Sequence, residues 1–154
     1  MAKKVGNGMV VLELKGLQRF IERFNVTAQT LLPAMGEALY NQALQIGQEA
    51  DELVPYDSGA LARSQIIHDA AYQGQFVYVD ITYGGPAGGL DQPYAEIQHE
   101  NLDFNHPSLA SGLPPNGRQA KYLEDPVDQA VAEGKLSDIL AWRIESILLN
   151  RMNL

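Results

Sequence analysis

The side chains best suited to chemistry are the three histidines and the carboxylates near them. Glu96 lies three positions before His99, a spacing that places both residues on one face of a helix. Together with His68 they predict one possible activity, that of a small metal-dependent hydrolase whose metal activates a water molecule. No HxxxH pair or other familiar ligand spacing accompanies them, so solvated polar side chains are the simpler alternative.

The patterns of other catalytic sites are missing from the sequence. It contains no cysteine, which removes disulfides, thiolate nucleophiles and thiolate zinc ligands. It has no GxSxG elbow, and the glycines of residues 84–89 follow neither GxGxxG nor a Walker-type GK[ST] pattern. Asp57-Ser58-Gly59 is typical of a capping turn rather than of an activated serine. We therefore expect a protein that is not an enzyme and that uses no metal or cofactor.

One tight junction separates a helical pattern from a strand pattern. Pro55 disfavours helical geometry at Val54, so the preceding helix is predicted to end there. Asp57 or Ser58 is expected to cap a short helical turn by accepting hydrogen bonds from backbone N–H groups two or three residues later. This junction is the most informative stretch of the chain.

The second half of the junction is predicted from side-chain size and polarity. Gly59 lies where a side chain would crowd the turn. Leu61 and Ile66 are expected to face inward, whereas Arg63 is expected to face water. By itself, this pattern is that of a joint between helix and sheet.

A long helix is predicted from Thr27 or Thr30 to Asp51, because apolar residues recur there at three- and four-residue spacings. Pro33 is tolerated only near the first turn of a helix, so it is expected to mark the start. The expected buried stripe consists of Leu32, Met35, Leu39, Ala43, Ile46, Ala50 and Leu53.

Shorter helices are predicted at both ends of the chain. Residues 16–24 show an amphipathic pattern, and residues 122–133 predict the first of two C-terminal helices. Ser137 is expected to cap the second, which runs to about Asn150. Its apolar stripe consists of Leu136, Ile139, Leu140, Ile144, Ile147 and Leu148.

Strand patterns occur in three places. Residues 9–14 predict an opening strand, and residues 63–72 and 76–83 predict a hairpin. In the second arm apolar and polar residues alternate strictly, so one side is expected to carry Val77, Val79, Ile81 and Tyr83. Residues 94–100 fit either a third strand or a short helix.

These elements predict the fold class α+β: an antiparallel sheet with a hairpin packed against one long helix, plus C-terminal helices. The 154 residues fit a single domain, 1–154, interrupted by long loops at about 84–93 and 101–120. Loops of this length in a compact domain are usually functional.

The charge of the chain argues against several partners. A formal net charge of −8 disfavours general nucleic-acid binding, which needs a basic surface, yet it suits a channel through which DNA slides. No run of about 18 apolar residues is present, so no membrane partner is expected. The absence of cysteine fits folding in a reducing cytoplasm.

Three separate pieces of the sequence resemble one protein family, the tail components of tailed bacteriophages. That family has a P-x-D-T/S-G-x-L-x-x-S turn after a long helix, and Ser58 stands here in place of the more usual threonine. Glu100-Asn101 stands where the family has a glycine. The resemblance spans about residues 35–135 and rests on Val54-Pro55-Tyr56-Asp57-Ser58-Gly59-Ala60-Leu61-Ala62-Arg63-Ser64, Pro93-Tyr94-Ala95-Glu96-Ile97-Gln98-His99-Glu100 and Lys121-Tyr122-Leu123-Glu124-Asp125-Pro126.

The resemblance implies a structural virion protein without catalytic activity. Members of the family include tail-completion, head–tail joining and minor capsid proteins. The implied function is a neck protein that forms a ring, typically hexameric, between the connector and the tail tube. Its partners would be further copies of itself and the neighbouring neck, connector and tail-tube proteins, with DNA passing through the lumen.

The turn and the two long loops are the interface elements that the resemblance suggests. The candidate residues are Pro55, Tyr56, Asp57, Ser58, Gly59, Leu61, Arg63 and Tyr94. Alternatives in the same class are a tail terminator or a minor capsid protein. Alternatives of other classes are the metal-dependent hydrolase and a cytosolic interaction module.

Overall fold

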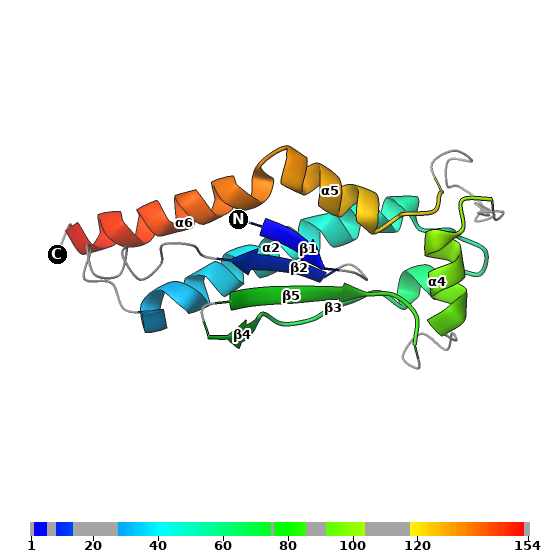
Figure 1. Cartoon of the computed structure of the whole chain (residues 1–154), viewed down its shortest axis with the longest axis horizontal. Helices are drawn as coiled ribbons and strands as arrows, with labels where there is room; N and C mark the ends of the chain where they lie inside the picture. The colour runs from blue at the N-terminus through cyan, green and yellow to red at the C-terminus, as the bar shows by residue number, and fades with distance from the viewer. Residues whose placement is uncertain are drawn as a thin grey trace.

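The computed structural model describes residues 2–5, 9–13, 28–74, 76–85, 92–103 and 118–152. The helix expected over residues 16–24 and most of both long loops lie outside these ranges. Within them the predicted class is confirmed, because an antiparallel sheet, one long helix and two C-terminal helices form an α+β fold (Figure 1).

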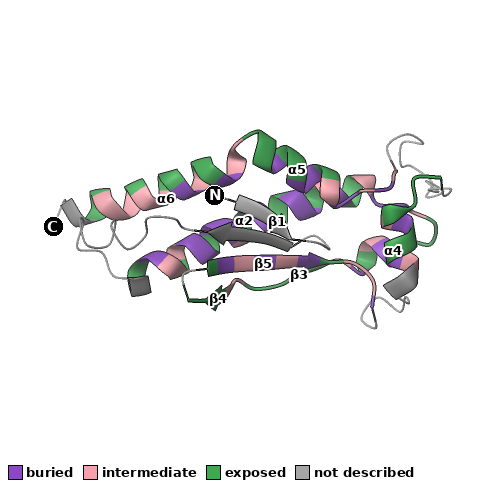
Figure 2. Cartoon of the chain, in the orientation of Figure 1, coloured by how far each residue is buried: buried purple, intermediate pink, exposed green. Residues whose placement is uncertain are grey.

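Helix α2, Ala28–Leu53, is the longest element and supplies much of the core. Its residues at three- and four-residue spacings are buried, as the sequence predicts, and its opposite side is exposed (Figure 2). The expected role of Pro33 is wrong: the helix begins five residues earlier, at Ala28. At the start of the stripe, Leu31 is buried more deeply than Leu32.

The sheet is antiparallel and is centred on β5. Strand β5 pairs with β2 on one side and with both β3 and β4 on the other, and β1 pairs with the far side of β2. The alternation expected in β5 is confirmed, since Val77, Val79 and Ile81 are all buried. The strands are β1 Ala2–Val5, β2 Met9–Glu13, β3 Ile66–Ile67, β4 Ala71–Gln73 and β5 Phe76–Thr82.

The first arm of the expected hairpin is not one strand. Residues 63–72 contain the end of a short helix, α3 Ala60–Arg63, then β3 and the start of β4, so two short strands share β5 as their partner. This division also corrects the facing of Ile66, which is 38% exposed, while Ile67 packs against the core. In a strand, a shift of one residue reverses the face of each side chain.

Three further helices complete the described chain. The 94–100 segment is helical, as one of its two alternatives had it: α4 is Gln92–Glu100, so the loop expected to reach residue 93 ends before Gln92. The C-terminal helices are α5 Glu124–Ala132 and α6 Lys135–Met152. Ser137 lies within α6 and donates its hydroxyl to the Gly134 carbonyl, so it is not the predicted cap.

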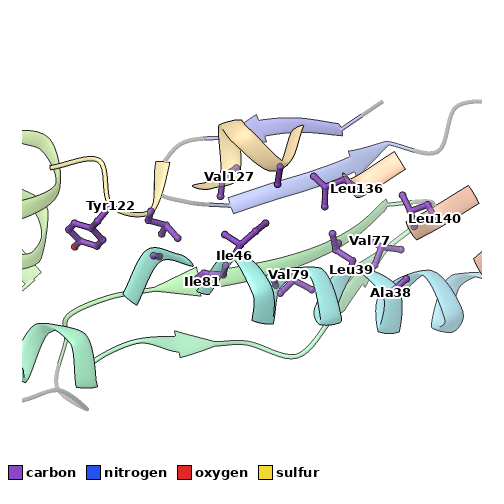
Figure 3. Packing of buried hydrophobic residues seen from close by; sticks show 14 of the residues in the cluster. Ala38, Leu39, Ile46, Val77, Val79, Ile81, Tyr122, Val127, Leu136 and Leu140 are labelled. Carbon is purple, nitrogen blue, oxygen red and sulfur yellow. The ribbon is translucent and has the colours of Figure 1, made fainter. Parts of the chain in front are cut away.

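One apolar core joins the helices to the sheet. Helix α2 runs along β5, and α5 and α6 run along α2 (Figure 1). Figure 3 shows Val77 and Val79 of β5 facing Leu39 of α2, with Leu136 and Leu140 of α6 closing the same space. Tyr122 lies at one end of this core, toward α4, and it is there that the candidate site is built.

Candidate functional site

The turn after α2 forms largely as predicted. The Val54 N–H still donates to the Ala50 carbonyl at 2.8 Å, after which the chain leaves the helix at Pro55. Of the two residues expected to cap α3, neither is at the N-cap position, although Ser58 Oγ accepts from the Ala60 N–H at 3.3 Å. The position just before α3 is taken by Gly59.

Gly59 is required by both conformation and space. Its φ is +77°, in the left-handed region that favours glycine. A Cβ there would lie 2.5 Å from the Tyr56 hydroxyl oxygen and 2.7 Å from Nη1 of Arg63. That Nη1 donates to the Ser58 carbonyl at 3.1 Å, while Leu61 points into the core. The predicted crowding at Gly59, the buried Leu61 and the exposed Arg63 are confirmed.

A shallow hollow separates the turn from α4. It has a volume of about 240 Å³ and is lined by Pro55, the residues 57–61 and Tyr94. Six of the eight candidate residues therefore line one feature, to which α4 contributes Tyr94. Tyr56 stands next to it, against Gly59.

The end of α2 is capped by a segment distant in sequence. Arg118 donates from Nη1 to the carbonyl of Val54 at 2.9 Å and to that of Asp51, and the Gln119 N–H donates to the Leu53 carbonyl at 2.9 Å. These are carbonyls that a helix end leaves without intrahelical partners. The Arg118 guanidinium also lies 5.6 Å from the centre of the Tyr56 ring, so it joins the helix end to the turn.

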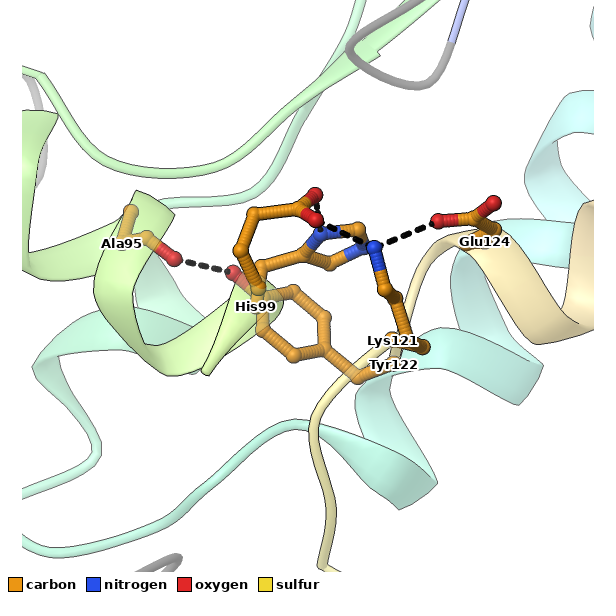
Figure 4. Close-up of polar contacts among 6 residues, drawn as sticks. Ala95, His99, Lys121, Tyr122 and Glu124 are labelled. Carbon is orange, nitrogen blue, oxygen red and sulfur yellow. Dashed lines mark hydrogen bonds and ion pairs between the residues drawn. The ribbon is translucent and has the colours of Figure 1, made fainter. Parts of the chain in front are cut away.

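Lys121 ties the same segment to α4. It has a positive φ of 57°, which is uncommon for a residue with a side chain, and its N–H donates to the His99 carbonyl at 2.8 Å. Its ammonium pairs with Glu100 and, at 2.9 Å, with Glu124 (Figure 4). The hydrogen bond to Glu100 raises the pKa of Lys121, and the same bond lowers the pKa of Glu100.

Tyr122 closes the site from the core side. It is 1% exposed, and its hydroxyl donates to the Ala95 carbonyl at 3.3 Å (Figure 4). Its ring makes edge-to-face contacts with Tyr83 at 5.0 Å and with His99 at 4.8 Å between ring centres. Burial raises the pKa of Tyr122, so the phenol stays neutral.

A polar network behind Tyr122 was not foreseen from the sequence. The Tyr83 hydroxyl donates to Asp51 Oδ1 at 3.1 Å, and Gln65 Nε2 lies within hydrogen-bond distance of Asp51, Tyr83 and the Gly47 carbonyl. Burial raises the pKa of Asp51, and burial followed by the charge of Asp51 raises that of Tyr83. These residues are far apart in sequence and form no motif, so nothing in the pattern signals them.

The proposed metal triad is not assembled. His68 contacts Thr82 Oγ1 at 3.2 Å beside the sheet, and Glu96 is exposed on α4. Among the described residues, the potential ligand atoms close enough to share an ion, within 4.8 Å of one another, belong to His99, Glu100 and Glu124. The Lys121 ammonium already lies between those two carboxylates and offsets one of their two negative charges.

Known proteins give no further guide to the role of this site. No family model, curated protein or solved structure matches the chain. Among the described residues, no helix has the length and hydropathy of a membrane span. The proposal that follows therefore rests on the residues and their arrangement.

Proposed function

We propose that this chain is a structural virion protein of a tailed bacteriophage, a neck or tail-completion protein. In this role it forms a ring between the connector and the tail tube, with DNA passing through the lumen. The observation that carries the proposal is that the three sequence pieces resembling this family pack on one another. Together with the adjoining residues 92 and 118–120, they form one unit, which we call the α4-end unit: residues 54–64, 92–100 and 118–126.

The contacts within the α4-end unit join all three pieces. Tyr94 lines the hollow of the turn, the Tyr122 hydroxyl bonds to Ala95, and Lys121 pairs with Glu100. Arg118, just before the third piece, lies over Tyr56 in the first. Contact among the three pieces supports the proposal, because it lets them act as one structural unit.

The α4-end unit also fixes the ends of both long loops. The first loop begins after Gly84, whose N–H donates to Ser64 Oγ at 2.7 Å, and ends at α4. The second begins after α4 and ends at Arg118, which caps α2. Rigid ends hold a loop where a neighbouring subunit or ring can bind it. In the proposal these loops and the turn residues are the contacts with neighbours.

The charge of the protein supports a passive contact with DNA. An excess of carboxylates repels phosphate, and every lysine or arginine side chain described has an internal partner. A lumen of this kind lets DNA slide without gripping it. The proposal therefore includes no specific DNA binding.

Complementation of a phage that lacks the gene tests this function. We expect the mutant to accumulate DNA-filled heads and separate tails, and we expect the purified protein to restore joined, infectious particles. Prior incubation with heads alone or with tails alone distinguishes a neck protein, which binds heads, from a tail terminator, which binds tails. Joined particles without the protein, or its absence from purified virions by mass spectrometry, would contradict the proposal.

A further inference from the structure

The second half of α6 is poorly covered by the rest of the described chain. None of residues 141–150 is fully buried, in contrast to Leu136 and Leu140 in the first half (Figure 2). Ile144, Ile147 and Leu148 pack partly against the core. The side facing away from the core nevertheless carries two large exposed apolar residues, Trp142 and Leu149. A helix with apolar residues on both sides is normally covered on both.

The outward side of α6 combines two large apolar residues with two carboxylates. Asp138, Trp142, Glu145 and Leu149 follow one another at spacings of four, three and four residues, so they share one face. We call them the α6 face. Trp142 is 60% exposed and Leu149 is 51% exposed. Tryptophan is the residue most enriched among binding hot spots, and here two carboxylates border it.

The sequence offers this acidic face a basic counterpart. Residues 1–23 hold five of the eleven Lys and Arg but only two of the nineteen Asp and Glu, a net of +3. The remaining residues hold six basic and seventeen acidic side chains, a net of −11. Five of those six basic side chains are described, and each has a partner within the chain: Arg63, Arg118, Lys121, Lys135 and Arg143.

We propose that the α6 face binds a second copy of this chain, through the basic N-terminal part of that copy. Charge complementarity favours the N-terminal part as the partner surface. If two α6 faces met each other, the carboxylates of one would lie against those of the other and repel them. The basic part includes β1, an edge strand with Lys3 and Lys4. A contact between two different surfaces of identical chains closes a ring when the rotation permits. The inference thus rests on the proposed ring and names its subunit contact.

The protein carries its own reporter for this contact, since Trp142 is its single tryptophan. A dilution series is followed in parallel by tryptophan emission and by light scattering after size exclusion. We expect the emission to shift to shorter wavelength over the same concentrations at which the mass rises above that of one chain. Emission that stays unchanged while the mass rises would place the contact elsewhere and overturn the inference.

Two variants that keep the reporter sharpen the test. Leu149→Glu is expected to weaken association by at least about 30-fold, the cost of removing a hot-spot contact. Leu44→Glu is the matched control, an exposed leucine on α2 at 37%, and is expected to associate like the wild type. Equal weakening by both variants would contradict a specific role for the α6 face. Emission at short wavelength in the monomer would show that the chain covers Trp142 itself, which also overturns the inference.

Charge reversal identifies the opposite surface. Asp138→Lys with Glu145→Lys is expected to reduce association, and adding Lys3→Glu and Lys4→Glu is expected to restore most of it. No restoration would reject the N-terminal part as the partner surface. The complementation assay separates this result from the proposed function. If the wild-type protein joins heads and tails but the α6 variants still associate normally, only the proposed contact is rejected.

Discussion

The two ends of the molecule use aromatic residues in opposite ways. At the α4-end unit Tyr122 is 1% exposed, and its hydroxyl and both ring edges have partners. At the other end, in the second half of α6, Trp142 is 60% exposed (Figure 1). The first arrangement is complete within one chain, whereas the second leaves a large apolar side chain in water.

This difference assigns different work to the two ends. The α4-end unit is held by hydrogen bonds and an ion pair between segments far apart in sequence, so it fixes the shape of the turn and the ends of the loops. The α6 face contributes little to the fold of one chain and is therefore available for association. Substitutions that separate folding from association test this division.

The largest difference is expected between Tyr122→Ala and Trp142→Ala. Truncating a buried aromatic ring costs about 3–5 kcal/mol, whereas truncating an exposed one costs less than about 1 kcal/mol. Urea unfolding of the two variants at a concentration where the protein is monomeric measures both values. Similar losses in the two variants would mean that the α6 face is part of the monomer's core.

Arg118→Met is expected to have the next largest effect. Met keeps an unbranched stem like that of Arg but removes the charged donor that serves the carbonyls at the end of α2, a loss of about 2 kcal/mol. Arg63→Met is the control, because Arg63 is exposed and, within the described part of the chain, its donor bonds to the Ser58 carbonyl. We expect it to cost less than about 1 kcal/mol in urea unfolding. A larger loss for Arg63→Met would make the turn, not the capping segment, the stronger element.

Periodicity predicted most of the fold, because burial on one face leaves a repeating pattern. The stripe of α2 and the alternation of β5 are of this kind. Boundaries that depend on neighbours were missed: Pro33 lies inside α2, and residues 63–72 divide into two strands. Sequence pattern alone does not show that these two short strands both pair with β5.

The candidate site was predictable only where one segment contains the whole signal. Gly59 is such a case, since its crowding comes from Tyr56 and Arg63 nearby. Arg118 gives no signal, because its hydrogen bonds reach segments more than 60 residues away. Asp51 gives none either, because its partners Gln65 and Tyr83 lie 14 and 32 residues away. The alternative considered from the sequence, a metal triad of His68, Glu96 and His99, is not assembled for the same reason. Residue type and helical spacing do not show whether a residue of the sheet lies near a helix.

Gly59→Ala compared with Gly74→Ala isolates crowding from backbone conformation. Both glycines have positive φ, so alanine at either position costs about 1–2 kcal/mol. At Gly74 a Cβ meets nothing within 4 Å, whereas at Gly59 it meets the Tyr56 hydroxyl and Arg63. We expect Gly59→Ala to cost about 1 kcal/mol more in urea unfolding. Equal costs would show that Tyr56 moves freely and that the turn is not fixed by Gly59.

The smallest effect concerns pH, and two carboxyls of the α4 end should act in opposite directions. Hydrogen bonds from Lys121 and then His99 lower the pKa of Glu100, so its stabilising effect is present above its ordinary pKa of 4.5 and is lost as the pH falls through the lowered value. Burial instead raises the pKa of Asp51 above 3.8, so its effect is most favourable below 3.8 and is lost as the pH rises through the raised value.

Glu100→Gln should therefore flatten the loss of stability in acid, whereas Asp51→Asn should steepen it. Urea unfolding of the wild type and both variants between about pH 3 and about pH 7 measures these slopes. The Glu100 carboxylate is half exposed, so its contribution is below about 1 kcal/mol and should shrink further in about 1 M salt. The pKa shift of Asp51 comes mainly from loss of hydration, which salt does not screen as it screens an ion pair, so its slope should persist in salt. If the pH dependence of stability due to both carboxyls vanishes in salt, the end of α2 is as open to water as the rest of the surface. That result would contradict the view that the α4-end unit is the rigid part of the molecule.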